Sequence, residues 1–141
     1  MQVEILPNVG VGKLRFGMTA AEIRNLMPIQ ARPFVKAPGA APTDAFDDLG
    51  VHVLYRGDGR CEAIELGAPS APTLEGTAVL AVPFTSVELL VKTLDSQLEI
   101  DESGLTSYAL GLAIYCPGHD ENPNLLVEGV FVFERGYYDA R

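Results

Sequence analysis

Two stretches of this chain share one local pattern, which constrains the fold more than any other feature. In each, a phenylalanine segment leads into Thr-x-x-Glu, first in residues 16–22 and again in residues 84–88. In each, a Leu-Gly pair then opens an apolar stretch, in residues 49–55 and in residues 110–115. Thr-x-x-Glu ahead of an apolar run is typical of a capping box at a helix start. The repeated order of helix start and strand predicts two related helix-plus-sheet halves.

The connections between the predicted strands are short, and their length predicts how the strands pair. Most are two to about eight residues long, which is too short for a parallel crossover. Gly57-Asp58-Gly59 predicts a tight hairpin between residues 51–55 and 61–66, because glycine tolerates the positive φ angles of short hairpins. The sequence therefore predicts an α+β fold, an antiparallel sheet with two short helices on one face.

The length of 141 residues fits a single domain, residues 1–141. We expect one pseudo-repeat at about residues 9–66, a second at about 77–135, and a linker at 67–76, which contains two prolines. The apolar positions expected in the core are Phe16, Ile23, Leu26, Val53, Ile64, Leu89, Ile114, Val130 and Val132.

The two predicted helices begin at threonines. Thr19 is expected to cap the first helix, with Glu22 reaching back to the backbone N–H of the cap, and Pro28 is expected to end it. Thr85 and Glu88 predict the same capping box for the second helix.

The charge balance excludes some classes of partner. There are 19 acidic and 10 basic residues, and the net charge of −9 repels phosphate backbones and anionic membranes. We therefore expect no nucleic-acid binding, although the same charge also serves solubility. No apolar run approaches the roughly 20 residues of a membrane span, and the N-terminus lacks the features of a signal peptide. The sequence predicts a cytoplasmic protein and leaves its oligomeric state open.

Two loops resemble ligand-binding templates but depart from them at required positions. Gly12-Lys13 lacks the spacing of a phosphate loop, and Leu14 stands where Ser or Thr must hold magnesium. The loop that begins at Asp120 places oxygen side chains as a calcium loop does, but Leu125 replaces its required glycine. Ordinary turn formation explains both loops.

No complete catalytic or metal-binding pattern is present. Cys116 and His119 have zinc-like spacing but leave two ligands unidentified, and no Gly-x-Ser-x-Gly elbow occurs. The sequence predicts a protein that is not an enzyme, with no catalytic residues, no metal and no cofactor. The two cysteines, Cys61 and Cys116, are expected to be reduced structural thiols.

Tyrosines and acidic pairs are the best candidates for a binding surface. Tyrosine is enriched at interface hot spots, and acidic side chains in predicted turns suit a rim that attracts a basic partner. The predicted partner-binding patch consists of Asp101, Glu102, Tyr108, Asp120, Glu121, Tyr137 and Tyr138. The alternative is that the tyrosines complete the edge of the core and the acidic residues solvate loops.

Residues 12–23, with Gly12, Phe16-Gly17-Met18-Thr19 and Glu22, resemble the opening of a group of small bacterial proteins. In these proteins a Phe-Gly-Met-Ser/Thr turn starts a short helix that antiparallel strands follow. The opening is similar to that of small outer-membrane assembly lipoproteins and of β-lactamase-inhibitory proteins, which repeat a helix-plus-sheet unit in tandem. The chain lacks a lipid-anchoring cysteine at its N-terminus and a cysteine pair within either half.

Toxin immunity proteins also have this small, acidic and cytoplasmic character. The resemblance implies a non-catalytic inhibitor that binds another protein, such as an immunity protein that neutralises a basic toxin domain. An envelope-assembly scaffold, and a small-ligand-binding or enzymatic domain with a pocket between sheet and helices, are the alternatives.

Overall fold

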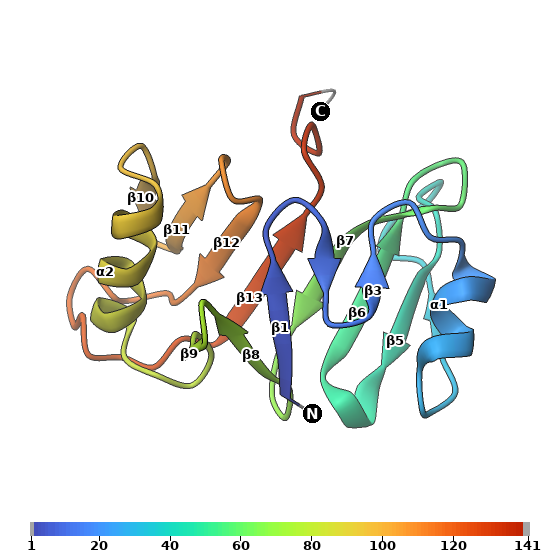
Figure 1. The fold of residues 1–141 in the computed structure, drawn as a ribbon, viewed down its shortest axis with the longest axis horizontal. Coiled ribbons are helices and arrows are strands. Elements are labelled where there is room, and N and C mark those ends of the chain that lie inside the picture. The colour runs from blue at the N-terminus through green and yellow to red at the C-terminus, as the bar shows by residue number, and fades with distance from the viewer. Residues whose placement is uncertain (1, 140–141) are drawn as a thin grey trace.

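The computed structural model describes residues 2–139, which contain two α-helices, α1 (Ala20–Leu26) and α2 (Phe84–Leu94) (Figure 1). The larger sheet is antiparallel, and its strands lie in the order β10 (Glu99–Asp101), β11 (Gly104–Ser107), β12 (Leu112–Tyr115), β13 (Gly129–Phe133), β7 (Cys61–Leu66), β6 (Val51–Tyr55), β5 (Thr43–Phe46) and β4 (Arg32–Phe34). The smaller sheet has the order β3 (Leu14–Arg15), β2 (Gly10–Val11), β1 (Gln2–Leu6), β8 (Ala71–Leu74) and β9 (Thr77–Ala78). A 3₁₀ turn, η1 (Asp47–Leu49), joins β5 to β6. The predicted α+β class with two short helices is confirmed.

The order of the strands in the larger sheet is symmetric about its centre. Each half consists of a helix followed by four strands, and the last strands of the two halves, β7 and β13, pair in the middle. Ile64 lies opposite Val132 in this antiparallel ladder. The smaller sheet departs from this pattern because β1 and β8 run parallel, with Val3 opposite Pro72. Residues 67–76, which their prolines predict to be a linker, include β8.

One face of the larger sheet forms the floor of the core. Along β6, Val51, Val53 and Tyr55 are buried and alternate with two less buried residues. Both helices and the smaller sheet lie on this face (Figure 1). The side chains that the two helices bury there are Ile23, Phe84, Val87 and Val91. No helix among residues 2–139 is long and apolar enough to cross a membrane.

The first helix begins as the sequence predicts. The Thr19 hydroxyl accepts a hydrogen bond from the backbone N–H of Glu22, and the Glu22 carboxylate accepts one from the backbone N–H of Thr19. This capping box satisfies two N–H groups that a helix start otherwise leaves unpaired. The helix ends at Leu26, two residues before Pro28.

The second helix begins differently, and the predicted capping box at Thr85 is wrong. The helix starts at Phe84 with Pro83 as the N-cap, and no side chain caps it. The Thr85 hydroxyl instead donates to the carbonyl of Pro123, while Glu88 pairs with Lys92 one turn further along. The backbone N–H groups of Phe84 and Thr85 donate to the carbonyls of Leu125 and Pro123, so the first turn of α2 needs no side-chain cap.

The expected core positions are buried with three exceptions. Leu26 and Leu89 are 43% and 61% exposed, so the prediction that they are buried is wrong. Phe16 is partly buried and packs against the core. The buried side of α2 consists of Phe84, Val87 and Val91. Leu89 lies on the other side of the helix and therefore faces water.

Candidate protein-binding face

The second face of the larger sheet is open. Within residues 2–139, both helices and the smaller sheet lie on the core face, which is turned toward the viewer in Figure 1. On the opposite face, His52 and Leu54 of β6 and Ala113 of β12 are partly exposed, and Tyr115 of β12 is 52% exposed. We call this surface the open face.

Ion pairs cover the part of the open face formed by β4 to β7. Arg32 pairs with Asp47 at 2.7 Å, and His52 lies between Asp47 at 3.8 Å and Glu65 at 3.3 Å. Lys36 reaches Glu65 at 3.4 Å. These contacts pair the charged groups of this half with one another, so little uncompensated charge remains there.

The part formed by β11 to β13 contains a hollow of about 240 Å³, which we call the trough. Tyr115 and Phe131 line it, and its floor consists of small residues of three adjacent strands, Gly104, Ala113 and Gly129. The strand register explains the shape, because Gly129 lies opposite Tyr115 and Ala113 lies opposite Phe131. Small residues therefore sit beside each large ring and leave space between the rings.

Five rings gather beside the trough, and we call them the aromatic cluster. Phe131 and Phe133 follow each other on one face of β13, with ring centroids 5.9 Å apart. Tyr138 lies edge-on to Phe133 at 5.0 Å, and Tyr108 lies edge-on to Tyr138 at 5.8 Å. Tyr137 contacts Phe131 at 5.5 Å. Because Phe131 also lines the trough, the cluster and the trough form one continuous surface.

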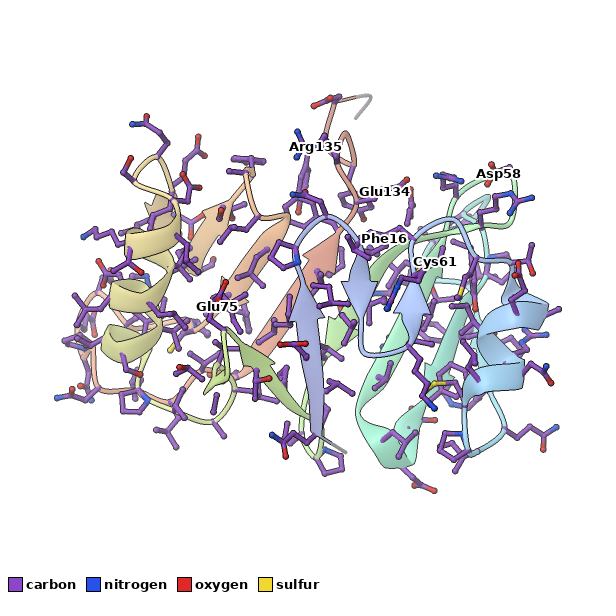
Figure 2. All side chains as sticks on the ribbon, viewed as in Figure 1. Phe16, Asp58, Cys61, Glu75, Glu134 and Arg135 are labelled. Atoms are coloured by element: carbon purple, nitrogen blue, oxygen red, sulfur yellow. The ribbon has the colours of Figure 1, made fainter. Side chains whose placement is uncertain are left out.

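The C-terminal segment after β13 carries two rings of the cluster and is tied to the sheet near its base. The Arg56 guanidinium donates to Glu134 at 2.9 Å and to Asp58 at 3.1 Å. Figure 2 shows Glu134 where the chain leaves β13, and Asp58 in the turn between β6 and β7. The backbone N–H of Glu134 also donates to the carbonyl of Glu62. These bonds hold Tyr137 and Tyr138 close to Phe133.

At the other end of β11, His119 brings two acidic loops together. Its Nε2 lies 2.5 Å from the carbonyl oxygen of Asp101, and its ring stacks on Phe84 with centroids 4.0 Å apart. The loop containing Asp120 therefore lies beside the turn containing Asp101. His119 is buried and has a structural role as the link between these loops.

The predicted patch is thus divided into two groups. Tyr108, Tyr137 and Tyr138 belong to the aromatic cluster, whereas Asp101, Glu102, Asp120 and Glu121 form what we call the acidic end. The groups lie beyond opposite ends of the four-residue strand β11, which spans about 13 Å. The trough lies between them. Asp101 is the one residue of the predicted patch that lines it, and the patch does not include Tyr115, Phe131 or Glu65, whose large side chains also line it.

A sequence signal for this surface exists in the distribution of charge. Residues 93–134 contain no lysine or arginine and eight acidic residues, Asp95, Glu99, Asp101, Glu102, Asp120, Glu121, Glu128 and Glu134. Of these eight, only Glu134 takes part in an ion pair among the residues that the structure describes. A surface of one sign steers a partner of opposite charge. The net charge of the whole chain, −9, does not reveal that eight acidic residues are gathered in this one segment without a lysine or arginine.

The two cysteines are free and lie near opposite ends of the sheet. Cys61 pairs across from Tyr55 at one end, and Cys116 follows β12 at the other. Burial raises the pKa of the Cys61 thiol to about 12 and also raises that of Cys116. Cys61 lies near Phe16 in Figure 2, and its carbonyl accepts a hydrogen bond from the backbone N–H of Gly17. Across residues 2–139 no three His, Cys, Asp or Glu side chains gather as metal ligands.

A second hollow, of about 290 Å³, lies between α1, the smaller sheet and the larger sheet. Val51 and Leu66 of the larger sheet line it together with Val11 and Leu14 of the smaller one. Leu26 at the end of α1 completes an apolar wall. The hollow lies where a ligand pocket between sheet and helices would be expected.

Comparison with known proteins identifies no relative of this chain: no protein-family model, no curated protein and no solved structure matches it.

Proposed function

We propose that this protein is a non-catalytic, protein-binding inhibitor, and most specifically an immunity protein that neutralises a basic toxin domain. The observation that carries the proposal is the open face, which combines exposed aromatic side chains with uncompensated acidic charge. Large rings supply binding energy once water is excluded, and acidic residues around them speed encounter with a basic surface. In the N-terminal half of the open face, by contrast, each cation has a carboxylate partner.

In this proposal the two groups of the predicted patch have different tasks. The acidic end attracts the partner over distances of about 10 Å or less at physiological salt, because ions screen longer interactions. The aromatic cluster then holds the partner at short range. Charge substitutions should therefore change the association rate, whereas substitutions of the rings should change the dissociation rate.

The first experiment tests for a partner directly. The chain is co-expressed with the product of the adjacent gene, and growth, complex formation and complex stability through purification are measured. We expect the chain to relieve toxicity and to copurify with the toxin in a fixed ratio. If neighbouring products are neither toxic nor bound, the immunity function is wrong.

The second experiment places the interface. Asp101→Lys combined with Glu102→Lys should slow association, and the effect should shrink as salt is added. Tyr138→Ala should accelerate dissociation about tenfold or more if the ring acts as a hot spot. The matched control is Glu4→Lys with Glu75→Lys, which changes the net charge equally but on the smaller sheet, where both side chains are exposed.

The apolar hollow between α1 and the two sheets supports a second candidate function, the binding of a small apolar ligand. Its volume of about 290 Å³ is just below the about 300–1,000 Å³ of small-molecule pockets, so a small ligand would fit best. A screen of small apolar compounds by thermal unfolding tests it, with Leu14→Trp as the variant that fills the hollow. Stabilisation of the parent chain that the variant loses would favour this function over inhibition.

A further inference from the structure

The trough has the dimensions of a site for one side chain. Its volume of about 240 Å³ is below the about 300–1,000 Å³ of pockets that enclose whole small molecules. It is open toward solvent beside Tyr115, which is 52% exposed. Gly104 and Gly129 in the floor have no side chains that a guest would have to displace. A group that projects from a partner's surface suits this shape better than a free metabolite.

Two carboxylates lie on opposite sides of the trough. Asp101 comes from β10 and Glu65 from β7, on either side of the three strands that form the floor. The Asp101 Oδ1 atom accepts hydrogen bonds from the backbone N–H groups of Ser103 and Gly104, and no cation pairs with this residue among residues 2–139. Glu65 is shared with His52 and with Lys36, so Asp101 carries the uncompensated charge.

The acidic lining continues beyond the trough. A neighbouring hollow of about 320 Å³ shares Glu65 and Gly129 with it, and Asp47 and Glu128 also line this hollow. Aromatic walls and carboxylates at both sides together favour a cation over a neutral or anionic guest.

We propose that the trough binds an arginine side chain of the protein partner, which deepens and rests on the protein-binding function proposed above. A guanidinium is planar, stacks on aromatic rings and holds five N–H donors in one plane that can reach carboxylate oxygens. The ring of Tyr115 supplies the stacking surface, while Phe131 contacts the aliphatic part of the guest. The acceptor is Oδ2 of Asp101, because Oδ1 already accepts from two backbone N–H groups. A lysine ammonium would use the charge but not the planar geometry.

The test uses a capped Gly-Gly-Arg-Gly-Gly peptide and the same peptide with citrulline, which is a neutral isostere of arginine. Binding to the ¹⁵N-labelled chain is followed by NMR. We expect the arginine peptide to shift the backbone amides of Gly104 and Gly129, with an affinity at least about fivefold above that of citrulline, as a cation–π contact of about 1 kcal/mol gives. Equal shifts from both peptides, or none from either, would overturn the proposal.

Three variants make the assignment specific. Asp101→Asn keeps an oxygen acceptor for Ser103 and Gly104 but removes the charge. Gly129→Val fills the floor, and a Cβ there would lie 3.7 Å from that of Tyr115, an ordinary contact distance. Both should weaken arginine binding about fivefold or more, and Tyr115→Leu should do the same if the valine variant fails to fold. Glu75→Gln is the matched control, because it removes one charge in the turn between β8 and β9 (Figure 2).

The results of these experiments can contradict the arginine site and the immunity function independently of each other. If a toxin binds and its affinity is unchanged by Asp101→Asn and Gly129→Val, the arginine site is wrong while the inhibitor function stands. If the arginine peptide binds in the trough but no protein partner is found with the adjacent gene products, the site stands and the immunity function fails.

Discussion

Arg24 of α1 holds the fully buried carboxylate of Asp44 in β5 through two hydrogen bonds, of 2.8 Å from Nε and 2.7 Å from Nη2. The Tyr55 hydroxyl donates a third bond to the same carboxylate at 2.8 Å. A buried carboxylate is costly unless its oxygens are paired, so this contact fixes α1 on the sheet. The Arg24 side chain itself remains 49% exposed.

Arg24→Ala should therefore destabilise the fold by about 2–3 kcal/mol. This is less than the about 3–5 kcal/mol of breaking a fully buried ion pair, because water reaches Arg24. Urea denaturation at pH 7 measures the change. Arg32→Ala is the control, since its pair with Asp47 is exposed on both sides and should matter much less. Equal losses in the two variants would contradict a special role for Asp44.

Stability should fall as the pH rises above about 9. Burial raises the pKa of the Cys61 thiol from 9.0 to about 12, and burial with the hydrogen bond to Asp44 raises the pKa of Tyr55 well above its usual range. Between pH 9 and 12 the unfolded chain releases these protons while the folded chain retains them, so the free energy of unfolding declines by about 1 kcal/mol per pH unit and group.

The pH dependence of Cys61→Ala tests that expectation independently of its absolute stability. The variant should lose the decline that begins near pH 9, while the Tyr55 part, which begins near pH 10, remains. Denaturation curves at half-unit intervals from pH 8 to pH 11 would show this. An unchanged slope in the variant would mean that the thiol does not retain its proton in the folded chain.

Both thiols should resist modification in the folded state. Cys61 and Cys116 are fully buried, and each has a raised pKa, so few thiolates are available near pH 8. We expect a colorimetric disulfide reagent to label neither residue in native buffer and both in denaturant. Rapid labelling of one cysteine in native buffer would show that its surroundings open locally.

Removing the Thr19 cap of α1 should lower the free energy of unfolding, and the same substitution at Thr85 of α2 should leave the start of that helix unchanged. Thr19→Ala removes the acceptor for the Glu22 N–H and should cost about 1 kcal/mol, with faster hydrogen exchange at that amide. Thr19→Ser should retain most of the stability because the hydroxyl remains. Thr85→Ala should not change amide exchange at the start of α2, because no side chain caps that helix.

Much of the larger sheet follows from periodicity and connection length in the sequence. The alternation at Val51, Val53 and Tyr55 and the glycine turn after them predict the β6–β7 hairpin that the structure contains. The face of a strand that remains open is harder to predict. Val130 and Val132 of β13 alternate with Phe131 and Phe133, and the sequence alone favours burial for all four.

The candidate site can be predicted only in part, because several of its residues become neighbours only when the strands pair. Asp101 and Tyr108 are polar or aromatic residues near turns, and such positions suggest a surface. Glu65 and Phe131 become neighbours only through the pairing of β7 with β13, across 66 residues of sequence. Similarly, nothing near Asp44 indicates that its partner is Arg24, because the contact depends on where α1 packs.

The position of β13 in the chain has a consequence for synthesis. It follows every other strand among residues 2–139, yet it lies at the centre of the sheet, between β12 and β7. Pairings this distant in sequence form late, since the chain between them must first be ordered. Until β13 has been synthesised, β12 and β7 lack the strand that joins the two halves of the sheet. Residues of β13 belong to both the trough and the aromatic cluster, so truncation before β13 removes both.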